Sequence, residues 1–188
     1  MEQTQLDVEF MDGYRDSKKE RNNMNVITCP QELKATSDVT VFLAGGITGC
    51  PDWQAEILEV IRRSPKWQNT EVTFVNPRRS TFDVSNPAET VFQIGWEKRH
   101  LDACDIIFFW FPEETLCPIT LYELGKAVGS KRSIMVGCHP VYKRRLDVIE
   151  QLNDVIDMYT FEGHTPVLST LTDTLDRLHS CINDEDIA

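Results

Sequence analysis

The sequence predicts an α/β fold with a doubly wound parallel sheet of four to five strands and helices on both faces. Three observations lead to this class. Short apolar runs alternate along the chain with longer segments of helical periodicity, which is typical of parallel strands joined by helices. The runs are apolar throughout, as expected for strands that are buried on both faces. Glycines or polar turns end most of the runs, where such sheets place their ligands.

The first regular strand is predicted over residues 39–44, an apolar and β-branched run that a pair of glycines ends. A helix over 51–63 follows. Pro51 suits the first position of a helix, and the charge of Asp52 favours the positive end of the helix dipole. Residues 72–75 then form the second strand, which leads into a loop of asparagine, proline and two arginines.

The middle of the chain continues this alternation. Asn86 is a natural N-cap with a proline behind it, so we expect a helix over 87–103. Residues 105–111 form the third strand, the most apolar run of the chain. A helical segment over 119–128 and a strand over 133–136 follow, and each ends at a glycine.

The two ends of the chain are less regular. Residues 1–25 are charged and without periodicity, which predicts a flexible polar arm in front of a single domain over 26–188. Residues 25–29 are expected to form either a short edge strand or an extended arm. Helices are predicted over 142–152 and, as an amphipathic closing helix, over 166–181.

Residues 154–159 are the candidate fifth strand. Four to five parallel strands covered by helices on both faces correspond to a flavodoxin-like sheet, which binds ligands at the carboxyl ends of its strands, near the point where the strand order reverses. The segments expected to meet at that edge are 45–46, 76–79, 111–123 and 137–145.

The charge of the chain restricts its partners. The net charge is −11 and the isoelectric point is about 4.8, which argues against binding to nucleic acid or to an anionic membrane. A local basic cluster could still bind the phosphate of a small ligand. No apolar run approaches the ~20 residues that cross a bilayer, and the N-terminus lacks the apolar core of a secretion signal. We therefore expect a soluble, cytoplasmic protein.

The side chains of metal and thiol chemistry are dispersed. The six cysteines have no CxxC spacing, which predicts reduced and mostly buried thiols. Cys117 is the exception to consider, because it precedes an expected helix start that could stabilise a thiolate. The four histidines show no HxxxH spacing and no aspartate pairing, so neither a metal nor a cofactor is expected.

Glu123 is the first candidate catalytic residue. It follows the buried strand over 105–111 and a polar turn, and we expect it in the first turn of the next helix, at the ligand edge of the sheet. Two interpretations stay open. With Thr120 it matches a T-x-x-E capping box, which is purely structural. Alternatively it is a nucleophile towards a sugar carbon, beside the apolar walls of Trp110 and Phe111.

The other candidates each have a structural and a functional interpretation. Glu97 is either a solvated glutamate paired with a neighbouring lysine or arginine, or an acid in the site. Asp105 is either a cap of the strand start or a substrate ligand. The basic pairs and triplets at 78–79 and 143–145 are either solvated or phosphate-binding. The glycine turn in 42–49 serves either packing or the approach of a ligand.

These motifs together resemble the nucleoside 2-deoxyribosyltransferase family, especially its bacterial and phage-type branch, over about residues 39–151. The resemblance rests on FLAGGITGCPDWQ, NPRR, QIGWE…LDACDIIFFWFP, PITLYELG and residues 136–148. It implies that Glu123 of the ELG segment is the nucleophile. An acidic residue about 26 positions earlier, which is Glu97 here, would bind and protonate the nucleoside, although family members usually carry aspartate there.

Two further positions depart from the family pattern. Cys117 stands where the family has an aspartate, six residues before the nucleophile, and Phe42 stands where better-known members have a tyrosine. The resemblance and the position of the sheet edge together place the substrate near a set of binding residues. These are Phe42, Gly45, Gly46, Asp52, Trp53, Asn76, Arg78, Asp105 and Cys117.

The implied function is cleavage or transfer of the N-glycosidic bond of 2′-deoxyribonucleosides or their 5′-phosphates, through a covalent glycosyl-Glu123 intermediate. Related deoxynucleotide N-hydrolases hold a 5′-phosphate, which Arg78, Arg79 or residues 143–145 could bind here. The implied partners are a small deoxynucleoside or deoxynucleotide, a free nucleobase and further copies of the chain, as a dimer or higher homo-oligomer. The alternative is a non-catalytic module that binds and senses a nucleotide.

Overall fold

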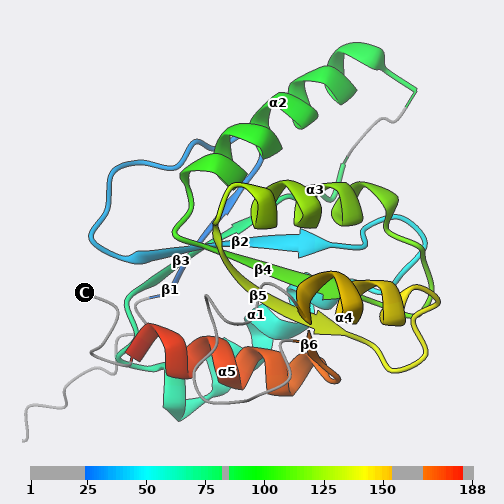
Figure 1. Ribbon diagram of the computed structural model, residues 1–188. Coiled ribbons are helices and arrows are strands. Elements are labelled where there is room, and N and C mark those ends of the chain that lie inside the picture. The colour runs from blue at the N-terminus through cyan, green and yellow to red at the C-terminus, as the bar shows by residue number, and fades with distance from the viewer. Residues whose placement is uncertain (1–23, 82–84, 154–166, 184–188) are drawn as a thin grey trace, which may run out of the picture.

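A parallel sheet between two layers of helices forms the described part of the protein (Figure 1). The computed structural model describes residues 24–81, 85–153 and 167–183. Within these residues the strands are β1 (Met24–Thr28), β2 (Val39–Gly45), β3 (Val72–Asn76), β4 (Ile106–Phe111), β5 (Ser133–Cys138) and β6 (Val167–Leu168). The helices are α1 (Trp53–Arg63), α2 (Pro87–Ala103), α3 (Pro118–Gly129), α4 (Arg145–Asn153) and α5 (Leu171–Asn183), with a 3₁₀ turn η1 (Pro65–Trp67).

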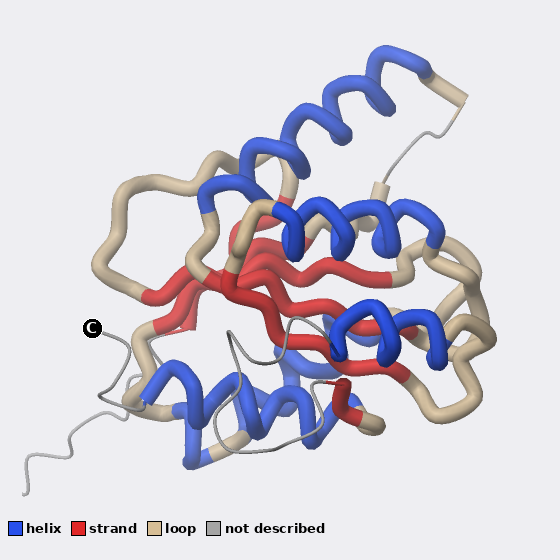
Figure 2. The backbone as a smooth tube through the Cα atoms, in the orientation of Figure 1, coloured by secondary structure: helices blue, strands red, loops and turns tan. Residues whose placement is uncertain are grey.

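The six described strands are all parallel and lie in the order β1-β3-β2-β4-β5-β6 (Figure 2). From β3 to β6 this is the order of a flavodoxin-like sheet, and β1 is added at the β3 edge. The strand order reverses between β2 and β4, so the turns after these two strands flank the switch point. The predicted doubly wound α/β class is confirmed.

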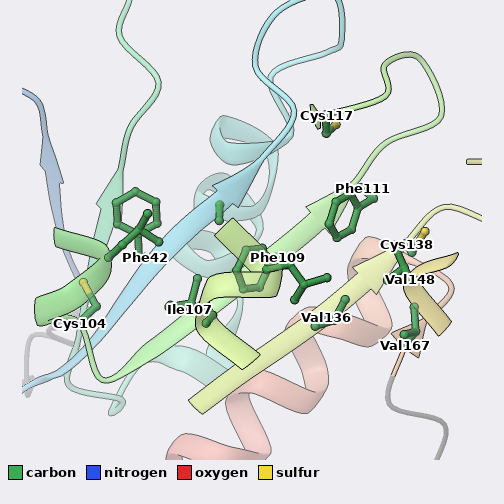
Figure 3. Packing of buried hydrophobic residues seen from close by; sticks show 14 of the residues in the cluster. Phe42, Cys104, Ile107, Phe109, Phe111, Cys117, Val136, Cys138, Val148 and Val167 are labelled. Atoms are coloured by element: carbon green, nitrogen blue, oxygen red, sulfur yellow. The ribbon is translucent and has the colours of Figure 1, made fainter. Parts of the chain in front are cut away.

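Two hydrophobic clusters explain why the strands are apolar throughout. On β4, Ile107, Phe109 and Phe111 belong to the cluster under α2, α3 and α4 (Figure 3). Phe108 and Trp110 belong to the cluster under α1 and α5. Successive side chains of a strand point to opposite faces, so a strand that is covered on both faces needs apolar residues at every position.

The sheet has more strands than the four to five predicted. Residues 24–28 are an edge strand and not an arm, because all five of them pair with β3. Val167 and Leu168 pair with β5, so the closing helix begins only at Leu171 and not at residue 166. The candidate strand over 154–159 lies outside the described residues, as do residues 1–23 of the predicted arm. No helix in the described part of the chain is long and apolar enough to span a membrane.

Candidate active site

Glu123 lies in the second turn of α3, because the helix begins at Pro118 and not at Thr120. Proline is favoured at a first helical position, and the cap is Cys117 in a left-handed conformation (φ 44°). Thr120 is therefore inside the helix and is not its cap, so the capping-box interpretation of Glu123 is wrong. Among the residues that the structure describes, none donates a hydrogen bond to the Glu123 carboxylate or forms an ion pair with it.

Glu97 lies on α2, on the same face of the sheet, and is half-buried. The amide nitrogen Nε2 of Gln93, one turn earlier, donates a hydrogen bond of 2.8 Å to Glu97 Oε1. Burial raises the pKa of Glu97, and the Gln93 hydrogen bond opposes that rise. Glu97 is therefore not the solvated, ion-paired glutamate of the structural interpretation.

The two carboxyl groups influence each other. The pKa of Glu123 is raised to about 7, first by burial and then by the negative charge of Glu97, while the positive charge of Lys126 partly opposes the rise. The ELG helix and α2 thus bring two acidic groups together in a partly dry place. Near neutral pH such a pair can share one proton, so that one group is a carboxylate and the other a carboxylic acid.

An aromatic cluster packs beneath α2, the helix that carries Glu97. The ring of Phe42 on β2 lies 6.4 Å from that of Trp96 on α2, and the indole nitrogen of Trp96 donates to the carbonyl of Gln31. The ring of His100 stacks on Trp96 at 4.0 Å, and its Nε2 accepts a hydrogen bond from the backbone N–H of Leu33. Phe42 is only 1% exposed, so it is part of this buried aromatic cluster and presents almost no surface to a ligand.

The glycine turn after β2 is required for packing. A Cβ on Gly45 would lie 2.5 Å from the carbonyl oxygen of Trp110 and 2.5 Å from the ring of Trp53. A Cβ on Gly46 would lie 3.0 Å from the sulfur of Cys117. Trp53 is buried and donates from its indole nitrogen to the carbonyl of Gly46. The three residues expected to bind substrate here thus hold the turn against α1 and the loop after β4.

Arg78 clamps the loop that follows β2. Its guanidinium nitrogens Nη1 and Nη2 donate to the carbonyls of Pro51, Ile47 and Cys50 and to the side chain of Gln54, over 2.8–3.1 Å. Its Nε lies 3.6 Å from Asp52, which also caps α1 by accepting from the N–H of Ala55. Asn76 at the end of β3 accepts from the Arg78 N–H. Asp52, Asn76 and Arg78 thus form a structural clamp at the expected edge.

Asp105 lies at the opposite edge of the sheet. It precedes β4, and its Oδ2 accepts hydrogen bonds from the N–H (2.8 Å) and the hydroxyl (2.6 Å) of Thr40, near the start of β2. Its own N–H donates to the Thr40 hydroxyl at 2.9 Å. The structure therefore corrects the assignment of Asp105 as a substrate ligand: it ties together the amino ends of the two central strands.

Cys117 is buried, and its thiol is far from ionising. Burial and the neighbouring Cys50 and Cys138 raise the pKa of Cys117 to about 12. The sulfur donates to the carbonyl of Thr115 at 3.5 Å. The expected thiolate at the helix start is thus wrong, because loss of hydration outweighs any favourable effect of the helix dipole.

Sequence reasoning missed Gln93. Its amide nitrogen also donates to the carbonyl of Pro77 (2.9 Å), and its amide oxygen lies 3.4 Å from Nη1 of Arg79. The sequence feature that could have identified Gln93 as a partner of Glu97 is their i, i+4 spacing, which places the two side chains on one helix face. The partners after β3 could not be read from that spacing.

A hollow lies at the same edge of the sheet. It has a volume of about 370 Å³ and is lined by Trp53, Glu56, Trp110, Glu113 and His139, among others. Neither Glu97 nor Glu123 lines it. Within residues 24–81, 85–153 and 167–183, no three histidine, cysteine or carboxylate side chains gather as a metal site would require.

Comparison with known proteins supports one family. A search among curated proteins found no match. A family model described as "Nucleoside 2-deoxyribosyltransferase like" matches residues 38–142, a span that contains both Glu97 and Glu123. Since this match covers more than half of the chain, the protein belongs to the nucleoside 2-deoxyribosyltransferase-like family.

Proposed function

We propose that this protein transfers or cleaves the N-glycosidic bond of 2′-deoxyribonucleosides, with Glu123 as the nucleophile and Glu97 as the acid. The observation that carries the proposal is the half-buried Glu123 carboxylate, which lacks a hydrogen-bond partner among the described residues and lies within the electrostatic reach of a second half-buried carboxyl group. A structural carboxylate is normally hydrogen-bonded when it is withdrawn from water, and a nucleophile must keep its lone pairs available.

The first half of the reaction would form a glycosyl ester. Glu123 attacks C1′ of the sugar, the bond between C1′ and the base nitrogen breaks, and its electron pair leaves with the base. Glu97 donates its proton to that base. A 2′-deoxy sugar favours this step, because it lacks the electron-withdrawing hydroxyl that opposes positive charge at C1′.

The second half would regenerate the enzyme. A second nucleobase or a water molecule attacks C1′ from the opposite side and gives its proton to the Glu97 carboxylate. The ester bond breaks and returns its electrons to Glu123, so the sugar keeps its original configuration. A base as acceptor makes the protein a transferase, and water makes it a hydrolase.

The contacts of Arg78, Arg144 and Arg145 favour a nucleoside over its 5′-phosphate. All four terminal N–H donors of Arg78 are occupied by protein acceptors, and its side chain is 17% exposed. Arg144 pairs with Asp147 at 2.8 Å, and Arg145 donates to the carbonyl of Cys138 and the hydroxyl of Ser169. A 5′-phosphate could bind these arginines only by replacing the protein acceptors that they already contact. The uncharged 5′-hydroxyl of a nucleoside does not require an arginine at all.

A homo-oligomer is the second part of the proposal. The N-terminal part of α2 extends beyond the sheet layers (Figure 1) and carries exposed Val91 and Ile94, and α3 carries exposed Ile119 and Tyr122. We take these exposed apolar side chains as the candidate interface. Light scattering after size-exclusion chromatography should give the mass of a dimer or larger, and Ile119→Asp should lower it. A monomeric mass for the unmodified protein would reject this part.

The test of the reaction is product analysis. The protein is incubated with deoxyinosine, with and without adenine, and the products are separated by chromatography. Hypoxanthine without acceptor indicates hydrolysis, and deoxyadenosine formed only with adenine indicates transfer. Glu123→Ala should abolish either product, whereas Glu150→Gln, on the exposed side of α4, should not.

Mass spectrometry tests the intermediate separately. Quenched reactions should show one deoxyribosyl group on the peptide that contains Glu123. A fully active Glu123→Ala variant would reject the proposed mechanism. Saturable nucleotide binding that Glu123→Gln leaves unchanged, with no product from any deoxynucleoside, would instead favour the sensing module.

A further inference from the structure

Gln93 connects the proposed acid to the loop that follows β3. Its side chain is 7% exposed, so its amide has little access to water. The amide nitrogen donates to Glu97 Oε1 at 2.8 Å and to the carbonyl oxygen of Pro77 at 2.9 Å. The amide oxygen faces Nη1 of Arg79 at 3.4 Å. Arg79 in turn lies 3.5 Å from Glu89, in the first turn of α2.

These partners fix the orientation of the amide. The Pro77 carbonyl can only accept a hydrogen bond, and the Arg79 guanidinium can only donate one. If the amide were turned over, its oxygen would face the carbonyl and its nitrogen would face the guanidinium. Two mismatched contacts in a buried place are costly, so the nitrogen must point to Pro77 and Glu97.

We propose that Gln93 is a positioning residue for the reaction: its amide holds Oε1 of Glu97 as an acceptor, so that the acidic proton is carried by Oε2. The inference rests on the proposed function, in which Glu97 protonates the leaving base. A proton on Oε1 would place two hydrogen-bond donors, this O–H and the Gln93 N–H, against each other. A proton on Oε2 leaves the hydrogen bond from Gln93 to Oε1 intact. Gln93 thus both holds the rotamer of the acid and selects the oxygen that delivers the proton.

The charged and titratable groups around Glu97 determine how the kcat/KM of the reaction depends on pH. Glu123 and Lys126 lie on α3, Arg79 follows β3, and Cys29 follows β1 and senses the charge of Glu97. The Gln93 amide is the hydrogen bond that stabilises the charged form of Glu97. Without it Glu97 should keep its proton to higher pH, and the basic limb of kcat/KM should move upward.

The experiment compares two variants without the donor to a matched control. Gln93→Met keeps the length of the side chain, and Gln93→Glu keeps its shape but replaces the amide nitrogen by an oxygen. Each should move the basic limb upward by about one to two pH units, because the charged form of Glu97 loses its hydrogen-bond donor. Each should lower kcat about 10- to 100-fold and leave KM nearly unchanged, because the acid loses its alignment and ground-state binding is retained.

Gln54→Met is the control, because Gln54 is a second buried glutamine (0% exposed) whose amide oxygen accepts from Arg78 and not from a group near Glu97. It should destabilise the fold without moving the basic limb. Circular dichroism verifies folding, and ¹³C NMR of glutamate carboxyls, assigned with Glu97→Gln, follows the titration of Glu97 without any need for turnover.

The outcomes separate the two proposals. If the unmodified protein is active and both Gln93 variants fold with unchanged kcat and unchanged limbs, the role of Gln93 is rejected and the proposed reaction stands. An equal shift in Gln54→Met also rejects it. If the unmodified protein converts no deoxynucleoside, the proposed function fails, and with it the positioning role. The NMR titration then still decides whether the amide controls the Glu97 carboxyl.

Discussion

The ionised Glu123 carboxyl group should lower the free energy of unfolding at neutral and alkaline pH. Burial and the charge of Glu97 disfavour its ionised form, and no described residue donates a hydrogen bond to compensate. Glu123→Gln keeps the size of the side chain and removes the charge. We therefore expect the variant to be inactive in nucleoside conversion and more stable than the unmodified protein above pH 7, as is common for groups that serve chemistry at the expense of the fold.

The magnitude follows from the pKa. The pKa of Glu123 moves from 4.5 to about 7, which is about 2.5 units, and each unit corresponds to about 1.36 kcal/mol. The product, about 3.4 kcal/mol, is an upper limit for the gain in unfolding free energy. The side chain is only half-buried, so water screens part of the penalty, and we expect a gain of about 1–2 kcal/mol.

The direction with pH follows from proton linkage. The folded-state pKa is raised, so the native protein binds this proton more tightly than the unfolded chain does. The stabilisation by the protonated carboxyl is fully present below pH 4.5 and is lost as the pH rises through 7. The advantage of Glu123→Gln should therefore be small near pH 4.5, grow up to pH 7 and remain constant above it.

Urea unfolding at about pH 5 and about pH 8.5 measures the difference in unfolding free energy between Glu123→Gln and the unmodified protein at each pH. The four buried tryptophans report the transition by fluorescence. Glu150→Gln, which removes an exposed carboxylate from α4, controls for the general loss of negative charge. Equal stability of Glu123→Gln and the unmodified protein at both pH values would refute the reasoning, as would a gain confined to the acidic side.

Three further predictions concern the scaffold. Thr40→Val removes the hydroxyl that donates to the Asp105 carboxylate and accepts from the Asp105 N–H, so the unfolding free energy should fall by about 1–3 kcal/mol, measured by urea unfolding at neutral pH. An unchanged midpoint would contradict the tie between the strand starts. Gly137→Ala would place a Cβ 2.3 Å from Thr174 Oγ1, so its melting temperature should fall, with overpacking costing about 1–3 kcal/mol. Cys117 should resist a thiol reagent at pH 8 until the protein unfolds, and rapid labelling of that residue in the native protein would show that its burial is wrong.

The sheet was predictable because apolar residues at consecutive positions mark each central strand several times over. The predicted strands over 39–44, 72–75 and 105–111 each agree with the observed strands to within one residue. A strand buried on both faces is apolar at nearly every position, and the short length and β-branched residues of these runs separate them from a buried helix. The cap of α2 was equally readable, since Asn86 accepts a hydrogen bond from the N–H of Ala88. The start of α1 was predicted two residues too early: the helix begins at Trp53, and Asp52 is its cap.

The start of α3 was not predictable in the same way, because two signals compete there. Thr120 and Glu123 match a capping box, while Pro118 favours a first helical position two residues earlier. The structure follows the proline, and this choice releases the Glu123 carboxylate from a capping role. A shift of three residues in the helix cap, from Thr120 to Cys117, thus decides whether the central residue of the proposed site is structural or available.

The role of Arg78 depends on contacts that no local pattern contains. Its acceptors lie on a loop and a helix start 24–31 residues earlier in the sequence. The position of an arginine at the ligand edge could be predicted from the strand that precedes it. Whether its donors face a ligand or are used by the protein is decided by the path of the loop after β2, which the sequence does not specify.

The direction of a strand could have separated the two acidic residues that bracket β4. Parallel strands place everything that follows them at the ligand edge and everything that precedes them at the opposite edge. Asp105 precedes β4 and bonds Thr40 near the start of β2, whereas Glu123 follows β4 on α3. A polar residue next to a buried strand therefore indicates a functional site only when it follows the strand in the chain. By this criterion Glu123 remains a candidate, and Asp105 is a tie between strands.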